Sequence, residues 1–239
     1  MIYKNSSVLI TGASQGIGRN IALTFAHESN RPLLLLARNR NNLEITADLC
    51  RQAGAEKVAV IVCDASSQDE LNRVTIPEGF PDPGLIINNA GGYLYKPLET
   101  TSEEEFRNQI DANLFTTVHV VKRFLPVLRT LDRGLIINIC SVAALKGLGD
   151  SGAYSASKHA LLGYTRSLRK ELIDTRIGVT AINLGQTHST SWEDSDMSPD
   201  KLINPSDVAE LIVTMSRLSP QSLVEEISIQ PQNGRVAPM

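Results

Sequence analysis

A chain of 239 residues, 42% of them hydrophobic and 21% charged, has the composition of a globular protein that needs no metal or disulfide staple. A net charge of -3 argues against nucleic-acid binding, which would require a basic surface. No apolar stretch approaches the roughly 20 residues of a membrane span. The apolar run that starts at Val8 leaves no room before it for a signal peptide. We therefore expect a soluble, cytoplasmic protein that binds neither nucleic acid nor membrane.

The cysteines bear on the chemistry and the compartment. Cys50, Cys63 and Cys140 are odd in number and lack the spacing of metal ligands. We expect reduced thiols buried in the core, and no metal site.

Seven short apolar runs alternate with longer amphipathic segments. The predicted strands are Ser7–Thr11, Leu33–Ala37, 58–63, 85–88, 135–140, 178–184 and 224–229. Most are near-continuous Val, Ile and Leu, which is typical of parallel strands covered on both faces. The alternation predicts a single α/β domain over 1–239 with a Rossmann-type, doubly wound parallel sheet. The string Gly-Leu-Ile-Ile-Asn occurs at 84–88 and 134–138, but its flanks differ, so we interpret it as two similar buried strands.

Hydrophobic residues recur with a helical period over 17–29, 102–131, 153–175 and 205–218. Ser102 and Glu105 predict a capping box at the start of the second helix. Asn204 followed by Pro205 predicts the start of the last one. The segment 188–203 is irregular and rich in Ser, Asp and Glu, and a loop of that length predicts a substrate lid.

A glycine-rich turn joins the first strand to the first helix. Glycine allows a tight turn with close backbone approach, and a helix N-terminus presents free N–H groups to phosphate. The turn predicts a dinucleotide site, with a purely structural turn as the alternative. The predicted contacts are Thr11, Gly12, Ser14, Gln15, Gly16, Ile17 and Gly18.

The residue after the second strand bears on the choice of cofactor. An acidic residue there would bond the ribose diol of NAD, whereas a basic one accommodates a 2′-phosphate. The residue is Arg38, with Arg19 and Arg40 nearby. A charge-assisted hydrogen bond contributes about 1.5–3 kcal/mol, enough for a tenfold preference. We therefore predict NADP(H) over NAD(H), with a solvated surface arginine as the alternative.

Tyr154 and Lys158 are four residues apart on a predicted helix, so they share one face. Lowering a tyrosine pKa from about 10 to about 7 takes about 4 kcal/mol. An ammonium about 4 Å away supplies about that much at an effective dielectric of about 20. Tyr154 could then exchange a proton with an alkoxide during hydride transfer, while Ser141 hydrogen-bonds the substrate oxygen. A chance Tyr-Lys pair is the alternative.

The ordered motifs together resemble the short-chain dehydrogenase/reductase family. The resemblance runs from the first strand to about residue 190 and is carried by 11–18, 88–91, Asn113, Ser141 and 154–158. It implies that Asn113 anchors a water in a proton relay from Lys158, and that Lys158 also bonds the nicotinamide ribose, next to Tyr154.

The resemblance also implies further cofactor contacts. Asp64 matches the position that contacts the adenine, and Asn89, Ala90 and Gly91 match the segment that backs the cofactor. Gly185 and Thr187 match the nicotinamide side, although Leu184 stands where the family usually has proline and Ser189 where it usually has threonine. Prolines at 77, 81 and 83 break a segment that is usually helical.

The implied substrate is a small carbonyl compound or alcohol. Side chains that could line its pocket are Tyr93, Leu94, Tyr95, Leu145, Leu148, Trp192 and Met197. The end of the chain, at 224–231, resembles sepiapterin-reductase-like members. A 3-oxoacyl-carrier-protein reductase is a competing interpretation. Its basis is a basic helical stripe of Arg166, Arg169 and Lys170, which an acidic carrier protein could bind. A solvated helix face is the simpler explanation of the stripe.

Two further expectations concern the protein as a whole. A non-catalytic NADP-binding sensor is the alternative from a different functional class, although a pure binder has no chemical need for Asn113, Ser141, Tyr154 and Lys158 together. The resemblance also implies a homo-oligomer, a tetramer or a dimer, packed through the helices at 102–131 and 153–175.

Overall fold

Seven parallel strands form one sheet in the order β3-β2-β1-β4-β5-β6-β7. The structure, a computed structural model, describes residues 6–192 and 196–232. The strands are β1 (Ser7–Thr11), β2 (Leu33–Ala37), β3 (Val58–Val62), β4 (Pro83–Asn88), β5 (Gly134–Ser141), β6 (Ile177–Leu184) and β7 (Glu226–Ile229). The strand order reverses between β1 and β4, which confirms the doubly wound sheet and places a crevice at the carboxyl ends of these strands.

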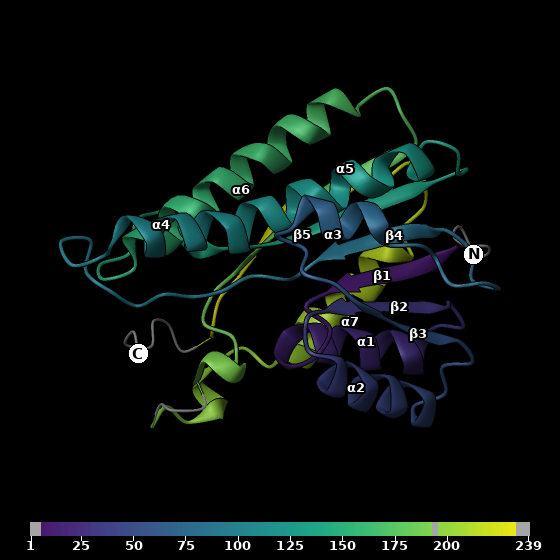
Figure 1. Ribbon diagram of the computed structural model, residues 1–239, viewed down its shortest axis with the longest axis horizontal. Coiled ribbons are helices and arrows are strands. Elements are labelled where there is room, and N and C mark those ends of the chain that lie inside the picture. Colours follow the sequence, from purple (N-terminus) through teal and green to yellow (C-terminus); the bar gives the residue numbers. More distant parts are fainter. Residues whose placement is uncertain (1–5, 193–195, 233–239) are drawn as a thin grey trace.

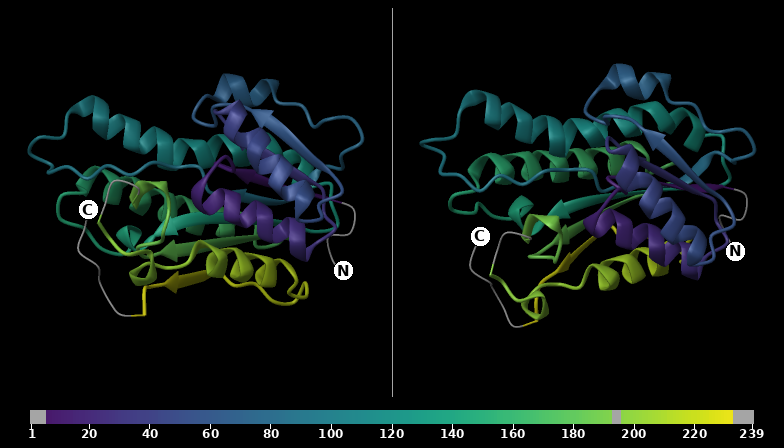
Figure 2. Two further views of the ribbon diagram at one scale, coloured as in Figure 1. Left: turned by 90° about the horizontal axis from the view of Figure 1, so that it is seen from below. Right: turned by 60° about the horizontal axis from the view of Figure 1, so that its bottom comes forward.

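Helices cover both faces of the sheet (Figure 1). They are α1 (Gly16–Glu28), α2 (Arg40–Gln52), α3 (Gln68–Arg73), α4 (Glu103–Ile110), α5 (Thr116–Leu128), α6 (Gly152–Glu171) and α7 (Pro205–Ser216). Phe25 of α1, Leu43 of α2 and Val208 of α7 belong to one core cluster, and Phe124 of α5 and Leu168 of α6 to another. The two layers are also visible in the turned views of Figure 2.

The apolar strands are explained by this double coverage. In β1, Val8 and Ile10 join the core with α1, α2 and α7, whereas Leu9 joins the core on the opposite face. Successive side chains of a strand point to opposite faces, so a strand buried on both sides reads as continuously apolar.

The duplicated Gly-Leu-Ile-Ile-Asn string lies on two neighbouring strands. Leu85 pairs with Leu135 and Asn88 with Asn138, so identical residues stand side by side across β4 and β5. Asn88 Nδ2 donates to Asn138 Oδ1 at 2.9 Å, and Asn138 Nδ2 donates to Thr165 Oγ1 at 2.8 Å. The string is therefore a matched pair of central strands with a buried amide contact.

The predicted helix over 102–131 is three segments. Its capping box is present, with Glu105 N donating to Ser102 Oγ at 3.2 Å and Ser102 N to Glu105 Oε2 at 2.8 Å. A π-helical turn, Asp111–Phe115, separates α4 from α5. Helix α3 is only six residues long, in line with the prolines that follow it.

The segment 188–203 is closed at its base. His188 N donates to Ile203 O at 3.0 Å, and Ile203 N donates to Gln186 O at 2.9 Å. Two short 3₁₀ turns, Thr190–Trp192 and Pro199–Lys201, lie within the loop, and its residues 193–195 fall outside the described part.

The basic stripe expected on α6 is neutralised by the edge strand β7. Arg166 Nε donates to Glu226 Oε1 at 2.7 Å and Arg166 Nη2 to Glu226 Oε2 at 2.9 Å. Arg169, whose side chain is 11% exposed, donates to Val179 O at 2.8 Å and lies 3.5 Å from Glu226. Two of the three cations of the stripe therefore hold α6 against the sheet, and the interpretation of the stripe as a docking site for an acidic carrier stays a prediction.

Two other expectations can be compared with the fold. The three cysteines are free and buried, as predicted, and burial raises the pKa of Cys50 to about 12 and that of Cys140 to about 11. Among the helices of residues 6–192 and 196–232, none combines the length and the apolar character needed to cross a bilayer.

Candidate active site

A cavity of about 510 Å³ opens where β4, β5 and β6 end. Its walls bring together residues that are far apart in the sequence. Those predicted as catalytic residues or cofactor contacts are Ile17, Asn89, Gly91, Asn113, Ser141, Tyr154, Lys158, Gly185 and Thr187. The cavity therefore lies at the carboxyl edge of the sheet, where ligands of doubly wound folds bind.

The glycine turn has the backbone form that a phosphate cradle needs. Gly12 has φ of 64° and Gly16 φ of 54°, in the left-handed region that favours glycine. A Cβ on Gly18 would lie 2.2 Å from Gly12 O, so no side chain fits there. Helix α1 has no side-chain N-cap and no acidic residue in its first turn, which leaves its first N–H groups available to an anion. The turn fits a dinucleotide pyrophosphate.

Thr11 and Asn89 lock the turn to the segment after β4. Thr11 Oγ1 accepts hydrogen bonds from Asn89 N and Ala90 N, each at 3.0 Å. Asn89 Nδ2 in turn donates to Thr11 O at 3.1 Å. Thr11 and Ala90 therefore act as braces behind the cavity rather than as part of its lining.

Asn113 lies in the π-helical turn and is 1% exposed. Its Nδ2 donates to Gly92 O at 2.9 Å and Gln109 O at 3.0 Å, while its Oδ1 accepts from Gly92 N at 3.2 Å. A Cβ on Gly91 would lie 2.7 Å from Asn113 Oδ1 and 3.6 Å from Lys158 Nζ. π-turns of this kind recur at functional sites. Here the turn aims Asn113 at the loop that borders Lys158.

Tyr154 and Lys158 share the inner face of α6, but the structure does not show the expected lowering of the Tyr154 pKa by the Lys158 ammonium. Lys158 Nζ lies 5.8 Å from the centre of the Tyr154 ring and donates to Ile139 O at 3.1 Å. Burial raises the pKa of Tyr154 to about 12, although a hydrogen bond with Ser141 opposes this, and burial also lowers the pKa of Lys158. The predicted shift of the Tyr154 pKa towards 7 is therefore wrong for this structure, since desolvation dominates and Lys158 is not among the groups that lower this pKa.

A second tyrosine supports the first. The rings of Tyr93 and Tyr154 are 4.9 Å apart and nearly perpendicular. The Tyr93 hydroxyl lies 2.9 Å from Ser151 Oγ, and Ser151, at the N-cap of α6, makes no side-chain cap bond. Serine at this position usually caps the helix. Its hydroxyl is instead committed to Tyr93, which buttresses the first turn of α6.

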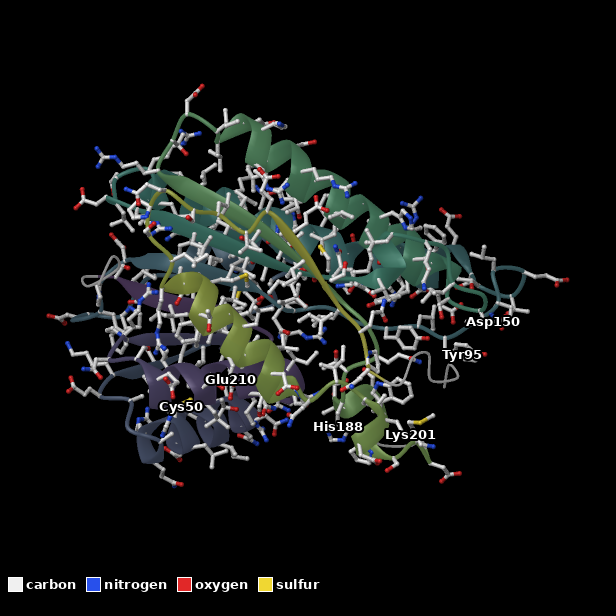
Figure 3. All side chains as sticks on the ribbon, turned by 180° about the vertical axis from the view of Figure 1, so that it is seen from behind. Cys50, Tyr95, Asp150, His188, Lys201 and Glu210 are labelled. Carbon is white, nitrogen blue, oxygen red and sulfur yellow. The ribbon has the colours of Figure 1, made fainter. Side chains whose placement is uncertain are left out.

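The loop that carries Tyr93 is fastened to the same helix terminus. Lys96 N donates to Asp150 O at 2.5 Å, and the Tyr95 hydroxyl lies 3.5 Å from Asp150 Oδ2. Figure 3 labels the side chains of Tyr95 and Asp150. Asp150 adopts φ of 54°, which aspartate tolerates better than most residues. Lys96 Nζ also donates to both oxygens of Glu105, at 2.7 and 2.8 Å. One loop thus ties α4 to the start of α6.

Arg38 and Asp64 lie outside the cavity lining and face each other. Arg38 Nη1 lies 3.8 Å from Asp64 Oδ2, and the arginine side chain is 80% exposed. Burial alone would raise the pKa of Asp64, but hydrogen bonds from Ser66 and the charge of Arg38 outweigh it and lower that pKa. Arg38 is exposed enough to meet a ligand, in competition with Asp64.

Close packing also surrounds Gly185, one of the two residues predicted for the nicotinamide side. A Cβ on Gly185 would lie 2.7 Å from Gln230 Oε1 and 3.0 Å from Ile229 O. Gly185 N donates to Ile229 O at 2.8 Å, and Thr187 Oγ1 donates to Gly185 O at 3.1 Å. Glycine is required after Leu184 because β7 approaches so closely.

The lid segment rests against the glycine turn. Gln15 Nε2 donates to Thr190 Oγ1 at 3.0 Å, and Trp192, which is 9% exposed, lines the cavity. Figure 3 shows His188 and Lys201 on this segment, below the end of the sheet. Thr190 and Trp192 of the predicted lid segment therefore lie beside the glycine turn and the cavity that the catalytic candidates border.

Only some of the residues expected to line the substrate pocket lie at the cavity. Tyr93, Leu148 and Trp192 line the cavity, whereas Tyr95 and Leu145 are exposed away from it. Leu94 and Met197 are not among the lining residues either. Sequence reasoning missed further lining residues: Cys140, Val142, Lys146, Ser151, Gln186 and Gln230. Most of these are close in sequence to Ser141, Tyr154 or Gly185, and that proximity is the signal that could have found them.

Comparison with known proteins gives matches over nearly the whole chain. The family model described as short chain dehydrogenase matches residues 6–199. An uncharacterized oxidoreductase of Staphylococcus aureus (strain MW2) is 30% identical over 230 residues, which are 96% of this chain and 99% of that relative.

Solved structures give the same result at the level of the fold. The alcohol dehydrogenase from the archaeon Thermococcus sibiricus, complexed with 5-hydroxy-NADP, has a TM-score of 0.86 and 27% identity, covering 97% of this chain and 99% of that one. A variant of actinorhodin polyketide ketoreductase with NADPH has a TM-score of 0.84 and 26% identity, covering 97% and 98%. The similarity thus extends well beyond the glycine turn.

Proposed function

Because this chain belongs to the short-chain dehydrogenase family of oxidoreductases, we propose that it reduces a ketone or aldehyde to an alcohol with NADPH. One observation carries the proposal: Ser141, Tyr154 and Lys158 border a single cavity beside a glycine turn that fits a pyrophosphate. A hydroxyl, a phenol and an ammonium in one cavity are the groups that proton-coupled carbonyl reduction needs.

The roles follow from the environment of each group. When bound, NADPH supplies the hydride. The Ser141 hydroxyl orients the substrate oxygen, and the Tyr154 phenol donates its proton as negative charge develops there. Because burial raises the pKa of Tyr154 to about 12, the phenol is protonated at neutral pH and can act as the acid in carbonyl reduction. Lys158 stabilises the phenolate that remains, and Asn113 holds the relay water through the second lone pair of its Oδ1.

The cofactor assignment rests on the turn and on its basic rim. We assign the pyrophosphate to Gly12, Gly16 and Gly18, the 2′-phosphate to Arg38, and the adenine to Asp64. Gly185 and Thr187 take the nicotinamide side, with the lid at 188–203 closing over it. Two of the similar structures described above contain NADPH or a modified NADP, which supports a preference for NADP(H) over NAD(H).

Turnover of NADPH with a carbonyl panel tests the proposal. The panel contains an acetoacetyl thioester, a diketone, an aromatic aldehyde and a pterin ketone, and NADH is run in parallel. We expect turnover on at least one class. Tyr154→Phe should lower turnover by about 10²–10⁴-fold while NADPH affinity stays unchanged. Tyr95→Phe is the matched control, because Tyr95 is exposed outside the cavity.

The results separate an enzyme from a sensor. Unchanged turnover in Tyr154→Phe would remove this residue from its role, and equal Michaelis constants for the two nucleotides would contradict the NADPH preference. NADPH binding without turnover on any compound would favour a non-catalytic NADP-binding sensor.

We also propose that the protein is a homo-oligomer, a dimer or a tetramer. Three large apolar side chains are exposed around α4. They are Leu98 before the helix, Phe106 on it and Phe115 in the π-helical turn that follows. In the described part of the chain, His119 Nδ1 is buried without a hydrogen-bond partner, and its ring lies 5.6 Å from that of Phe115. An exposed apolar surface of this kind fits contact with a second copy.

A further inference from the structure

Arg19 connects three parts of the nucleotide-binding half of the protein. It lies on α1, and its Nη2 donates to Ser14 O in the glycine turn at 2.6 Å. Its Nε donates to Thr46 Oγ1 on α2 at 3.0 Å. Thr46 is fully buried, and its hydroxyl faces Asn42 O at 3.0 Å and Ser14 O at 3.4 Å. The Arg19 guanidinium is therefore held in place by the buried Thr46 hydroxyl and by Ser14 O.

Arg19 differs from the other two arginines near the turn in having no carboxylate partner among the described residues. Arg38 lies 3.8 Å from Asp64, and Arg40 lies 3.8 Å from Glu44, so each has a carboxylate partner. Over residues 6–192 and 196–232, no ion pair joins Arg19 to a carboxylate. Its partners are a carbonyl and a hydroxyl, which leave its full positive charge beside the turn.

The bond to Ser14 O controls the geometry of the turn. The peptide between Ser14 and Gln15 is planar and trans, so its C=O and N–H point in opposite directions. Arg19 draws the carbonyl towards α2, and this aims the Gln15 N–H the other way. Gly16, with φ of 54°, follows immediately and opens α1. Fixing one carbonyl therefore orients the donors that lead into the helix N-terminus.

We propose that Arg19 is a positioning residue for the dinucleotide, which holds the Ser14–Gln15 peptide in its phosphate-binding orientation and places an unneutralised charge behind it. The inference rests on the dinucleotide site proposed above. Because the pyrophosphate is common to both nucleotides, Arg19 acts on NADPH and NADH alike, whereas Arg38 acts on the 2′-phosphate alone.

Binding measurements on the full-length protein test this without a substrate. Trp192 is the only tryptophan and lines the cavity, so energy transfer from it to bound NADPH or NADH reports occupancy. We expect Arg19→Met to raise the Kd of both nucleotides by about tenfold and leave their ratio unchanged. Arg19→Lys, which keeps the charge but not the planar fork, should restore part of the affinity.

Two other arginines serve as comparisons. Arg40→Met is the matched control, because Arg40 is exposed and paired with Glu44, and it should change neither Kd. Arg38→Met should weaken NADPH alone. Thr46→Val, which removes the hydroxyl that holds Arg19, should reproduce part of the Arg19→Met effect, and it keeps the test available if Arg19→Met does not fold.

The outcomes are distinguishable. An Arg19→Met protein with circular dichroism and Tm like the parent but unchanged Kd values would overturn the inference. Weakening of NADPH alone would also overturn it, because Arg19 would then bind the 2′-phosphate. Equal weakening of both nucleotides with no recovery in Arg19→Lys would contradict the role of the charge. If the parent protein binds neither nucleotide, the proposed function itself fails, and this inference fails with it.

Discussion

Gly18 is the position in the nucleotide-binding turn with the least room for a side chain. Its Cβ would lie 2.2 Å from Gly12 O and 2.6 Å from Asn89 Nδ2. Neither neighbour can move freely, because Asn89 is bonded to the backbone of Thr11. The requirement for glycine at this position is therefore steric.

We expect Gly18→Ala to lower the free energy of unfolding by about 1–3 kcal/mol and to weaken NADPH binding. Urea unfolding and nucleotide titration measure the two effects. Gly163→Ala is the control. Gly163 is an exposed residue of α6, and a Cβ there would meet no atom within 4 Å, so the substitution should stabilise the helix by about 0.5–1 kcal/mol. Equal effects of the two substitutions would contradict the steric argument.

Tyr154 should titrate far above its usual range in the free protein. Burial raises its pKa to about 12, so its neutral form is stabilised by folding. This contribution is complete below about pH 10 and is lost as the pH rises through the folded pKa. NMR of ¹³Cζ-labelled tyrosine, with Tyr154→Phe for assignment, checks the value. A midpoint near 7 would instead support the lower value expected from the Tyr-Lys spacing.

The pKa of Tyr154 shows what residue spacing can and cannot predict. The spacing of Tyr154 and Lys158 predicted that both share one helix face, and both border the cavity. The spacing could not show that Lys158 donates to Ile139 O on β5, because that contact depends on how α6 packs against the sheet. The desolvation that governs Tyr154 likewise depends on tertiary packing.

At the scale of elements, the contact between α6 and β7 rests on Glu226. Its carboxylate accepts two hydrogen bonds from Arg166 and lies 3.5 Å from Arg169. The hydrogen bond from Arg166 lowers the pKa of Glu226. A carboxyl group with a lowered pKa stabilises the fold above its ordinary pKa, and that stability is lost as the pH falls.

Glu226→Gln should lower the free energy of unfolding by about 1 kcal/mol at pH 7, because both arginines are partly solvated or have other acceptors. It should also flatten the decline in stability as the pH falls below about 4.5. Denaturant unfolding across pH measures both. Glu225→Gln, at the more exposed neighbour, should have a smaller effect. An unchanged pH profile in Glu226→Gln would contradict this assignment.

The elements differ in how well the sequence predicts them. All seven strands were predicted, because burial on both faces produces continuous apolar runs. The π-turn at Asp111–Phe115 was not predicted, because a five-residue change of pitch leaves the helical hydrophobic period nearly intact. The neutralised stripe on α6 was missed because Glu225 and Glu226 are more than 50 residues away in the chain.

For the whole molecule, the proposed self-association can be tested at one side chain. Phe106→Glu places a charge on the exposed apolar surface of α4 and should shift the oligomer towards monomer in sedimentation velocity. Ile45→Glu is the control, because Ile45 is an exposed apolar residue on α2, outside both helices of the proposed interface. A monomeric parent protein, or an oligomer unaffected by Phe106→Glu, would contradict the proposed interface.

The overall topology was predictable because strand–helix alternation leaves few ways to bury every strand. The sequence did not indicate that Ser151, in the wall of the candidate active site, supports Tyr93 instead of capping α6. That arrangement depends on the loop between β4 and α4 reaching the start of α6, and no local pattern encodes it.

The adjacent copies of Gly-Leu-Ile-Ile-Asn have a consequence for the order in which the sheet assembles. Because β4 and β5 present the same side chains in the same register, either strand could at first occupy the slot beside β1 with nearly equal burial. The connecting helices must then determine which strand pairs with β1. Thr165 of α6 contributes, because its hydroxyl accepts a hydrogen bond from Asn138 of β5. We therefore expect a strand-exchanged intermediate to compete with the native fold during refolding, which would appear as a slow refolding phase.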